Sequence, residues 1–123
     1  MPALAEASLT DTERRALDLA VSNLRDELGE RLRSVWLYGS RARGEPPRPE
    51  SDVDLLVVLD HYDWVEDKGA HDAVWRAQED VGLDKVFIST LFYDVDWLAR
   101  RREIKSFFIQ EVDRDKIVLY GEP

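Results

Sequence analysis

The stretch GSRARG at residues 39–44, followed after a short loop by SDVDL at residues 51–55, places a tight turn just ahead of two carboxylates. Asp52 and Asp54 stand at the start of the apolar run at residues 53–59, which is typical of a strand covered on both faces. Successive strand side chains point to opposite faces, so we expect Asp52 and Asp54 to emerge on the same face. Adjacent carboxylates repel each other unless a cation or hydrogen bonds compensate them. The pattern therefore favours a divalent metal such as Mg²⁺, which takes carboxylate, water and phosphate ligands.

The turn itself is suited to an anion. Gly39 permits unusual backbone dihedrals and close approach, and Ser40 offers a hydroxyl and an exposed amide. If a short helical turn follows, its free N–H groups favour a bound phosphate, and Arg41 and Arg43 either add charge there or are solvated surface residues. Together the two segments predict a site for a nucleotide and a metal, where in-line attack on an α-phosphate is the natural reaction.

The elements predicted around these segments form an α/β chain. Thr10 and Glu13 have capping-box spacing and open a helix that Gly29 ends. A strand at residues 34–38 leads into the turn, and a proline-rich loop covers residues 45–51. The remaining elements are a helix at residues 64–81, a strand at residues 85–93, a short helix capped by Asp94 or Asp96, another begun by Ser106, and an edge strand at residues 117–120. We expect one domain over residues 1–123.

The composition of the chain indicates which classes of partner and which location to expect. The net charge of −9 argues against a broad nucleic-acid surface and favours a basic protein partner, or serves solubility alone. The chain has no cysteine, which excludes disulfides and thiolate sites, and a cytoplasmic location is expected. Residues 1–9 do not read as a signal peptide, and the apolar run at residues 55–59 is too short to span a bilayer, so no membrane association is expected.

Several other conspicuous side chains are expected to be structural. Surface or packing roles are predicted for His61, His71, Trp36, the arginines at residues 100–102 and the pair Phe107-Phe108, the last as an anchor of the final helix on the sheet. The remaining tryptophans, Trp64, Trp75 and Trp97, either complete the core or form an exposed patch. Tryptophan is enriched at the energetic centres of protein interfaces, so the second alternative implies a protein partner.

The segments at residues 39–44 and 51–55 resemble the signature of the polymerase-β-like nucleotidyltransferase superfamily, and the length and element order resemble its minimal, MNT-type members. The resemblance implies an α/β (α+β) fold with a small mixed sheet flanked by helices. It implies that Gly39 and Ser40 bind the triphosphate and that Asp52 and Asp54 coordinate Mg²⁺. The implied reaction transfers a nucleoside monophosphate, AMP from ATP, to a protein or other hydroxyl acceptor. Minimal members are found as antitoxins beside HEPN-domain toxins, so a HEPN-type toxin partner is implied; a homo-oligomer is also compatible.

One position departs from the family pattern. Active members carry a third carboxylate on a later strand, and the corresponding position here falls near Phe87. Asp84 either substitutes for it or is a turn residue, whereas Asp94 and Asp96 are expected to be helix caps. Two hypotheses follow. The chain is either a working Mg²⁺-dependent transferase or a degenerate binding module that neutralises a toxin partner by forming a complex.

Overall fold

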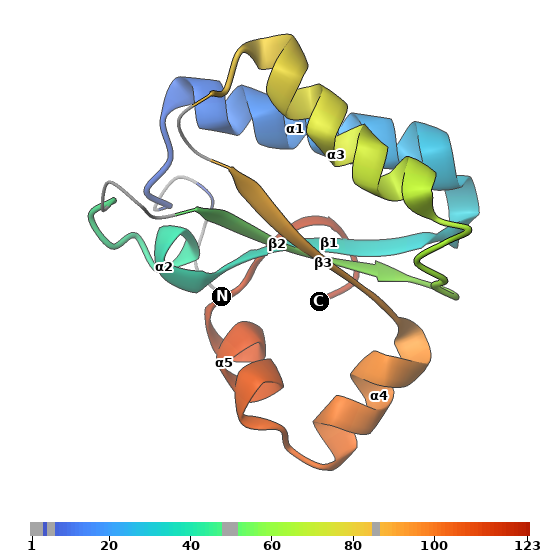
Figure 1. The fold of residues 1–123 in the computed structure, drawn as a ribbon. Coiled ribbons are helices and arrows are strands. Elements are labelled where there is room, and N and C mark those ends of the chain that lie inside the picture. Colours follow the sequence, from blue (N-terminus) through green and yellow to red (C-terminus); the bar gives the residue numbers. More distant parts are fainter. Residues whose placement is uncertain (1–3, 5–6, 48–51, 85–86) are drawn as a thin grey trace.

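The computed structural model describes residue 4 and residues 7–47, 52–84 and 87–123. In chain order the elements are the helix α1 (Asp11–Leu28), the 3-10 turn η2 (Gly29–Arg31), the strand β1 (Leu32–Tyr38), the short helix α2 (Gly39–Ala42), β2 (Val53–Leu59), α3 (Lys68–Val81), β3 (Ile88–Asp94), α4 (Val95–Glu103), α5 (Phe107–Asp115) and β4 (Ile117–Gly121). Figure 1 shows α1 and α3 above the sheet and α4 and α5 below it.

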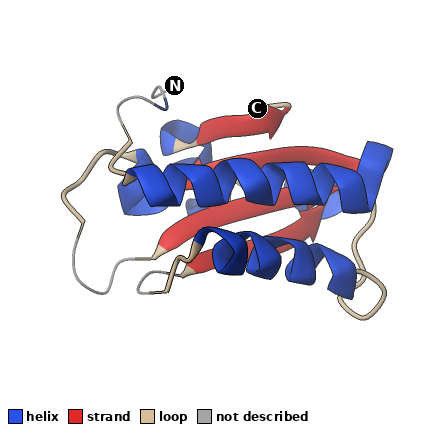
Figure 2. Cartoon of the chain, turned by 90° about the horizontal axis from the view of Figure 1, so that it is seen from above, coloured by secondary structure: helices blue, strands red, loops and turns tan. Residues whose placement is uncertain are grey.

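The four strands form one mixed sheet in the order β3-β2-β1-β4. Strand β1 pairs antiparallel with both β2 and β4, whereas β2 and β3 run parallel. Seen from above, α1 and α3 lie side by side across one face of this sheet (Figure 2). The predicted fold class, a small mixed sheet flanked by helices, is confirmed.

Strand β2 divides the core into two halves because its side chains alternate between the faces. Val53, Leu55, Val57 and Leu59 pack with α1 and α3 in the larger cluster. Leu56 and Val58 pack with α4 and α5 in the smaller one. All six side chains are at most 1% exposed, as predicted for a central strand. By alternation, Asp54 belongs to the face that α4 and α5 cover.

The start of α1 is the predicted capping box. The Thr10 amide donates to Glu13 Oε1 at 2.8 Å, and the Glu13 amide donates to Thr10 Oγ1 at 3.1 Å. Gly29 follows the helix with a φ of +56°, a conformation that glycine adopts without strain. Within the described part of the chain, no helix is long and apolar enough to cross a membrane.

Helix α3 and the strands β1 and β3 begin at other residues than predicted. Helix α3 begins at Lys68 and not at residue 64, because the Asp63 carboxylate accepts the amides of Val65 and Glu66 and holds this segment in a turn. Strand β1 begins at Leu32, directly after η2, and not at residue 34. The predicted strand at residues 85–93 corresponds to β3, but Lys85 and Val86 lie outside the described residues.

The predicted Phe107-Phe108 anchor is wrong for Phe107, whose side chain is 79% exposed. Helix α5 instead begins at its Ser106 cap and buries Ile109 and Val112, one turn further on. Phe108 makes one edge-to-face contact with Tyr38, with ring centroids 5.7 Å apart. The spacing of the apolar residues does not show where a short helix meets the sheet, so the prediction is wrong for Phe107, whereas Phe108 does contact the strand residue Tyr38.

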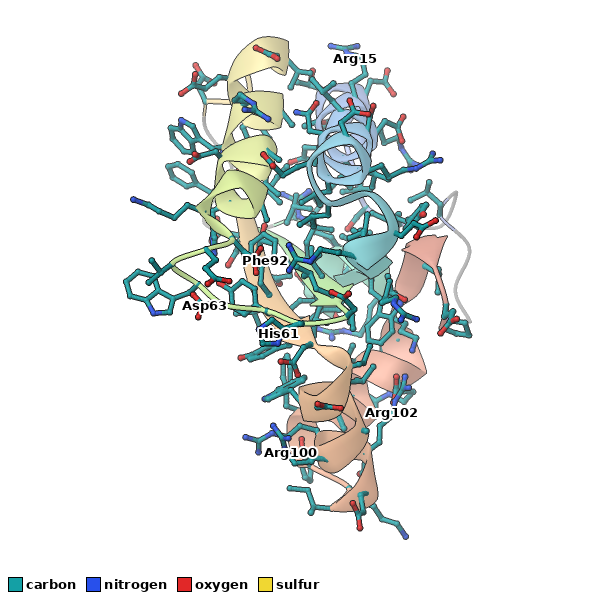
Figure 3. All side chains as sticks on the ribbon, turned by 90° about the vertical axis from the view of Figure 1, so that its right-hand side faces the viewer. Arg15, His61, Asp63, Phe92, Arg100 and Arg102 are labelled. Carbon is teal, nitrogen blue, oxygen red and sulfur yellow. The ribbon has the colours of Figure 1, made fainter. Side chains whose placement is uncertain are left out.

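The tryptophans, His71 and the arginines of α4 include both buried and exposed side chains. Trp36 is in the core, whereas Trp64 and Trp75 are 70% and 52% exposed. The His71 ring packs on Phe92, with ring centroids 4.3 Å apart, as expected of a packing residue. Figure 3 shows Arg100 and Arg102 projecting from α4 toward different sides, and Arg102 pairs with Asp113 at 2.8 Å.

Candidate functional site

The Gly39 turn and Asp54 are in direct contact. Strand β1 ends at Tyr38, and Gly39 turns the chain into the single helical turn α2 with a φ of +79°. A Cβ atom placed on Gly39 would lie 2.6 Å from Asp54 Oδ2, well inside van der Waals contact. Glycine is therefore required twice, for its backbone conformation and for the space that the carboxylate occupies. Figure 1 shows α2 at the end of the sheet where β2 begins.

Asp54 carries negative charge that its surroundings leave uncompensated. Within the described residues, neither Asp52 nor Asp54 makes a hydrogen bond or an ion pair. Burial raises the pKa of Asp54, and the charge of Asp52 raises it further, while the charges of Arg41 and Arg43 act in the opposite direction without cancelling the effect. An excess of negative charge in a partly buried place is the environment that a bound cation relieves.

Arg41 is a structural residue. Its side chain is only 3% exposed, and its Nη1 donates to Glu13 Oε1 at 2.7 Å and to the Ser8 carbonyl at 3.0 Å. Although burial acts to raise the pKa of Glu13, the hydrogen bonds from Arg41 and Thr10 hold it below its ordinary value. The ion pair ties the turn at Gly39 to the first turn of α1. Of the two predicted alternatives, solvated surface is wrong for Arg41, whereas its charge does act on Asp54.

Arg43 forms ion pairs with carboxylates other than Asp54. It pairs with Glu45 and lies 3.7 Å from Asp115 Oδ2 at the end of α5. Hydrogen bonding to Glu45 leads the effects that raise the pKa of Arg43, so the guanidinium keeps its charge. That charge reaches Asp54 only through space. Arg43 therefore moderates the field at the site without pairing with Asp54.

A cavity of about 120 Å³ opens beside the turn, lined by Tyr38, Gly39, Arg43, Phe108, Glu111 and Val112. Tyr38 sits opposite Asp54 in the register of β1 and β2. Burial raises the pKa of Tyr38 to about 12, with further contributions from the charges of Asp54 and Tyr93, so its phenol stays protonated at neutral pH.

Tyr38 and Glu111 lie beside the site but are not among the residues predicted for it. The position of Tyr38 immediately before Gly39 was an available signal, because a residue at the end of a strand lies beside the turn that follows. The sequence holds no such signal for Glu111, because Glu111 lies beside the site only through the packing of α5 against β1.

Among the described residues of the third strand, none beside the aspartates is acidic, and the one acid of β3, Asp94, stands at its far end. Asp54 pairs in register with Ser89, and the Val53 amide donates to the Phe87 carbonyl at 3.0 Å, so Phe87 and Ser89 flank the aspartates on the β3 side. Asp94 caps α4 by accepting the Trp97 amide at 2.8 Å, as predicted. The exposed Asp84 makes no interaction with either aspartate among the residues described.

The donor set fits a divalent cation that keeps most of its other ligands from outside the protein. The described residues hold no group of three or more His, Asp or Glu side chains arranged around one metal position. Two carboxylates remain, and Mg²⁺ is commonly held by one or two carboxylates together with water and substrate phosphates. The structure thus brings Gly39, Asp52 and Asp54 to one end of the sheet, with Ser40 next in the turn.

Comparison with known proteins gives the family. A family profile described as "Nucleotidyltransferase domain" matches residues 21–118, which is well over half of the chain. A solved structure described as a toxin-antitoxin with AMP-PNP is 18% identical to this chain, with a TM-score of 0.51. The match covers 84% of this chain and 72% of the chain in that structure. A mutant of the toxin-antitoxin MntA-HpeT is 16% identical, covers 83% and 71%, and gives a TM-score of 0.50. At these identities the two structures show a shared fold. No curated protein matches the chain. The expected resemblance is confirmed, and the chain belongs to the nucleotidyltransferase domain family.

Proposed function

We propose that this protein is a Mg²⁺-dependent nucleotidyltransferase that moves a nucleoside monophosphate, AMP from ATP, to a hydroxyl group of a protein partner, and that it serves as the antitoxin of a HEPN-type toxin. The family match and the toxin-antitoxin structures of similar fold support this class of activity. The observation that carries the proposal is the Asp54 carboxylate, which lies against the Gly39 turn without a partner among the described residues.

The residues divide the work between metal and phosphate. Asp52 and Asp54 would hold Mg²⁺, which when bound would neutralise charge on the triphosphate and bring its oxygens close to the acceptor. Gly39 and Ser40 would bind the triphosphate at the turn, where Ser40 offers its hydroxyl and amide as donors. Tyr38, protonated at neutral pH, adds no further negative charge beside Asp54.

The reaction follows from this arrangement. The acceptor hydroxyl oxygen attacks the α-phosphorus, and the bond from that phosphorus to the oxygen bridging the β-phosphate breaks as pyrophosphate leaves. The hydroxyl proton is lost to water, because Phe87 and Ser89 supply no carboxylate on the β3 side. Without a positioned base, we expect slow turnover compared with family members that have one.

Transfer is tested with α-labelled ATP, Mg²⁺ and the protein encoded beside this gene as acceptor. We expect label on the acceptor, a loss of roughly 100-fold or more in Asp54→Asn, and unchanged transfer in Asp96→Asn, which removes an exposed carboxylate on α4. Calorimetry of the same variants gives a second readout: Asp54→Asn should weaken Mg²⁺-dependent ATP binding. Label transfer that persists at the wild-type rate in Asp54→Asn would contradict the proposal.

The second candidate function is neutralisation by binding alone. The observation in its favour is the absence of a carboxylate at Phe87 and Ser89. A double variant, Asp52→Asn with Asp54→Asn, separates the two functions in cells that express the toxin. Full protection from the toxin by the double variant supports the binding module, whereas loss of protection with an intact complex supports transfer.

A further inference from the structure

Strand β3 is an open edge of the sheet. It stands last in the strand order, and its pairing with β2 places Val53 opposite Ile88. The Val53 amide donates to the Phe87 carbonyl, so alternate residues from Ile88 onward turn their backbone groups away from β2. The Ile88 amide donates to Gln78 Oε1 at 2.6 Å, so the Gln78 side chain covers the start of this edge. The backbone groups of Thr90 and Phe92 lie further along it.

The edge lacks the protection that natural sheets usually have. Edge strands are typically guarded by lysine, proline, a bulge or short length. The strand sequence ISTLFYD at residues 88–94 contains no proline and no lysine, and its register with β2 is continuous. Its one charged residue, Asp94, stands at the end of the strand, where its side chain caps α4. The opposite edge strand, β4, is shorter and has an irregularity where Val35 and Trp36 pair with it. The two edges therefore differ in their capacity to accept another strand.

A groove of about 140 Å³ runs beside this edge, lined chiefly by Val74, Trp75 and Gln78 of α3 and by Ile88, Thr90 and Phe92 of β3. Its floor includes the apolar side chains of Val74 and Phe92, at most 5% exposed, beside the buried polar side chain of Gln78, whereas Trp75 is 52% exposed at the rim. In Figure 3 Phe92 is labelled where β3 passes beneath α3. A large, half-exposed tryptophan over a groove with apolar side chains in its floor has the form of an interface anchor.

The exposed surface of α3 beside Trp75 carries charges of both signs, because Arg76 is exposed between Asp72 and Glu79. Asp72 and Glu79 are exposed and stand three residues before and four residues after Trp75, so the three share one face of α3. Asp84 lies exposed in the connection from α3 to β3, and Lys68 supplies a positive charge at the far end of the helix. The chain as a whole carries a net charge of −9. Exposed acidic residues outnumber basic ones on this surface, as they do over the whole chain, so a partner with basic side chains is complementary to it.

We propose that the β3 edge and its groove bind an extended segment of a partner protein in which apolar residues alternate with lysine or arginine. The segment would pair with the backbone of Thr90 and Phe92, place an apolar side chain in the groove beside Trp75, and bring basic side chains to Asp72 and Glu79. This inference rests on the proposed function only for the existence of a protein partner. It names the surface and the chemistry by which that partner is held.

The test uses the whole chain labelled with ¹⁵N and a peptide probe of sequence VKVKVKV with blocked ends. We expect shifts of the Thr90 and Phe92 amides and of the Trp75 indole in NMR spectra. The peptide VKVPVKV, whose proline removes a backbone donor, and the acidic peptide VEVEVEV should bind at least about tenfold more weakly. Trp75→Ala should lose about tenfold in affinity, whereas Trp64→Ala, which removes an exposed tryptophan outside the groove, should lose none.

Each other result overturns the inference. Shifts centred elsewhere, equal binding of the proline peptide, or no binding at millimolar probe exclude strand addition at this edge. Concentration-dependent shifts of the β3 amides without probe would assign the surface to a second copy of this chain. Asp54→Asn should bind the probe normally, so a failure of nucleotide transfer and a failure of this surface are observed separately.

Discussion

Gly39 is the residue at which backbone conformation and site chemistry meet, because its φ of +79° and its contact with Asp54 both exclude a side chain. In Gly39→Ala we expect a loss of about 1–2 kcal/mol of unfolding free energy and displacement of the Asp54 carboxylate. Gly82→Ala is the matched control, since Gly82 has a φ of +73° and nothing within 4 Å of the added methyl. Urea unfolding should show a loss in both variants, and calorimetry should show weaker ATP binding in Gly39→Ala alone. Equal nucleotide binding by both variants would refute the steric account.

Asp54 destabilises the fold in its charged form. Its pKa is raised by burial and by Asp52, so the ionised carboxylate is disfavoured in the folded state at neutral pH, and the penalty disappears as the pH falls below that pKa. Asp54→Asn mimics the neutral form. We expect a gain of about 1 kcal/mol at pH 7, or roughly 4 °C in the unfolding midpoint, and no gain near pH 3. A stability gain that is independent of pH would contradict this reason.

Glu13 and Arg41 form an ion pair in which both side chains are 3% exposed. In Glu13→Gln the acceptor for the Thr10 amide is retained and the charge is lost, which leaves Arg41 buried beside a neutral group. We expect a loss of about 2 kcal/mol, because a buried hydrogen bond between two charged groups becomes one to a neutral group. Urea unfolding measures this loss of unfolding free energy. The control is Glu30→Gln, which neutralises an exposed carboxylate in η2 and should change the unfolding free energy by less than about 0.5 kcal/mol. A similar small change in Glu13→Gln would show that water replaces the pair.

At the scale of elements, Asp113 joins α4 to the end of α5. Its carboxylate accepts from Arg102 Nη2 at 2.8 Å and from Lys116 Nζ at 2.7 Å, and the Lys116 ammonium lies 3.8 Å from the centroid of the Trp36 ring on β1. In Asp113→Asn we expect a loss of about 2 kcal/mol, since the pair with Arg102 is partly exposed but Lys116 is only 3% exposed and loses its carboxylate. Hydrogen exchange should accelerate in α4 and α5 and stay unchanged in α1. Uniform acceleration would mean that the whole fold, not this joint, is affected.

The strands and long helices were predictable because their signals are local. The capping box at Thr10 and the apolar run of β2 each determine an element without help from elsewhere. The start of α3 was not predictable, because the Asp63 side chain competes with the helix for the amides of Val65 and Glu66. The exposed Phe107 was misassigned because its face depends on how α5 meets the sheet.

The candidate site was predictable where it is contiguous with the motif and not where it depends on tertiary packing. Gly39, Ser40, Asp52 and Asp54 follow from two short segments, and their roles as ligands remain predictions. The structural role of Arg41 depends on Glu13 in a helix far away in the sequence. Spacing along the chain carries no information about such a pair.

At the scale of the whole molecule, acid should unfold the protein. Despite the opposing effect of burial, ion pairs hold the pKa values of Glu13, Asp67, Asp113 and Asp115 below their ordinary values of 4.5 for Glu and 3.8 for Asp. A lowered pKa gives stability that is present above the ordinary value and is lost as the pH falls through the folded value. Asp54 alone among the described carboxylates shifts the other way. We therefore expect the unfolding midpoint to fall steadily below about pH 4. A midpoint that is constant down to pH 2.5, followed by circular dichroism, would contradict this balance.

A single oxygen, Glu13 Oε1, accepts both the Thr10 amide that begins α1 and the Arg41 guanidinium that holds the Gly39 turn. Fraying of the first turn of α1 and loosening of the turn at the site are therefore linked equilibria. By thermodynamic reciprocity, a nucleotide that orders the turn must slow amide exchange at residues 11–14. Changes at the beginning of the chain will then alter nucleotide affinity without touching the nucleotide.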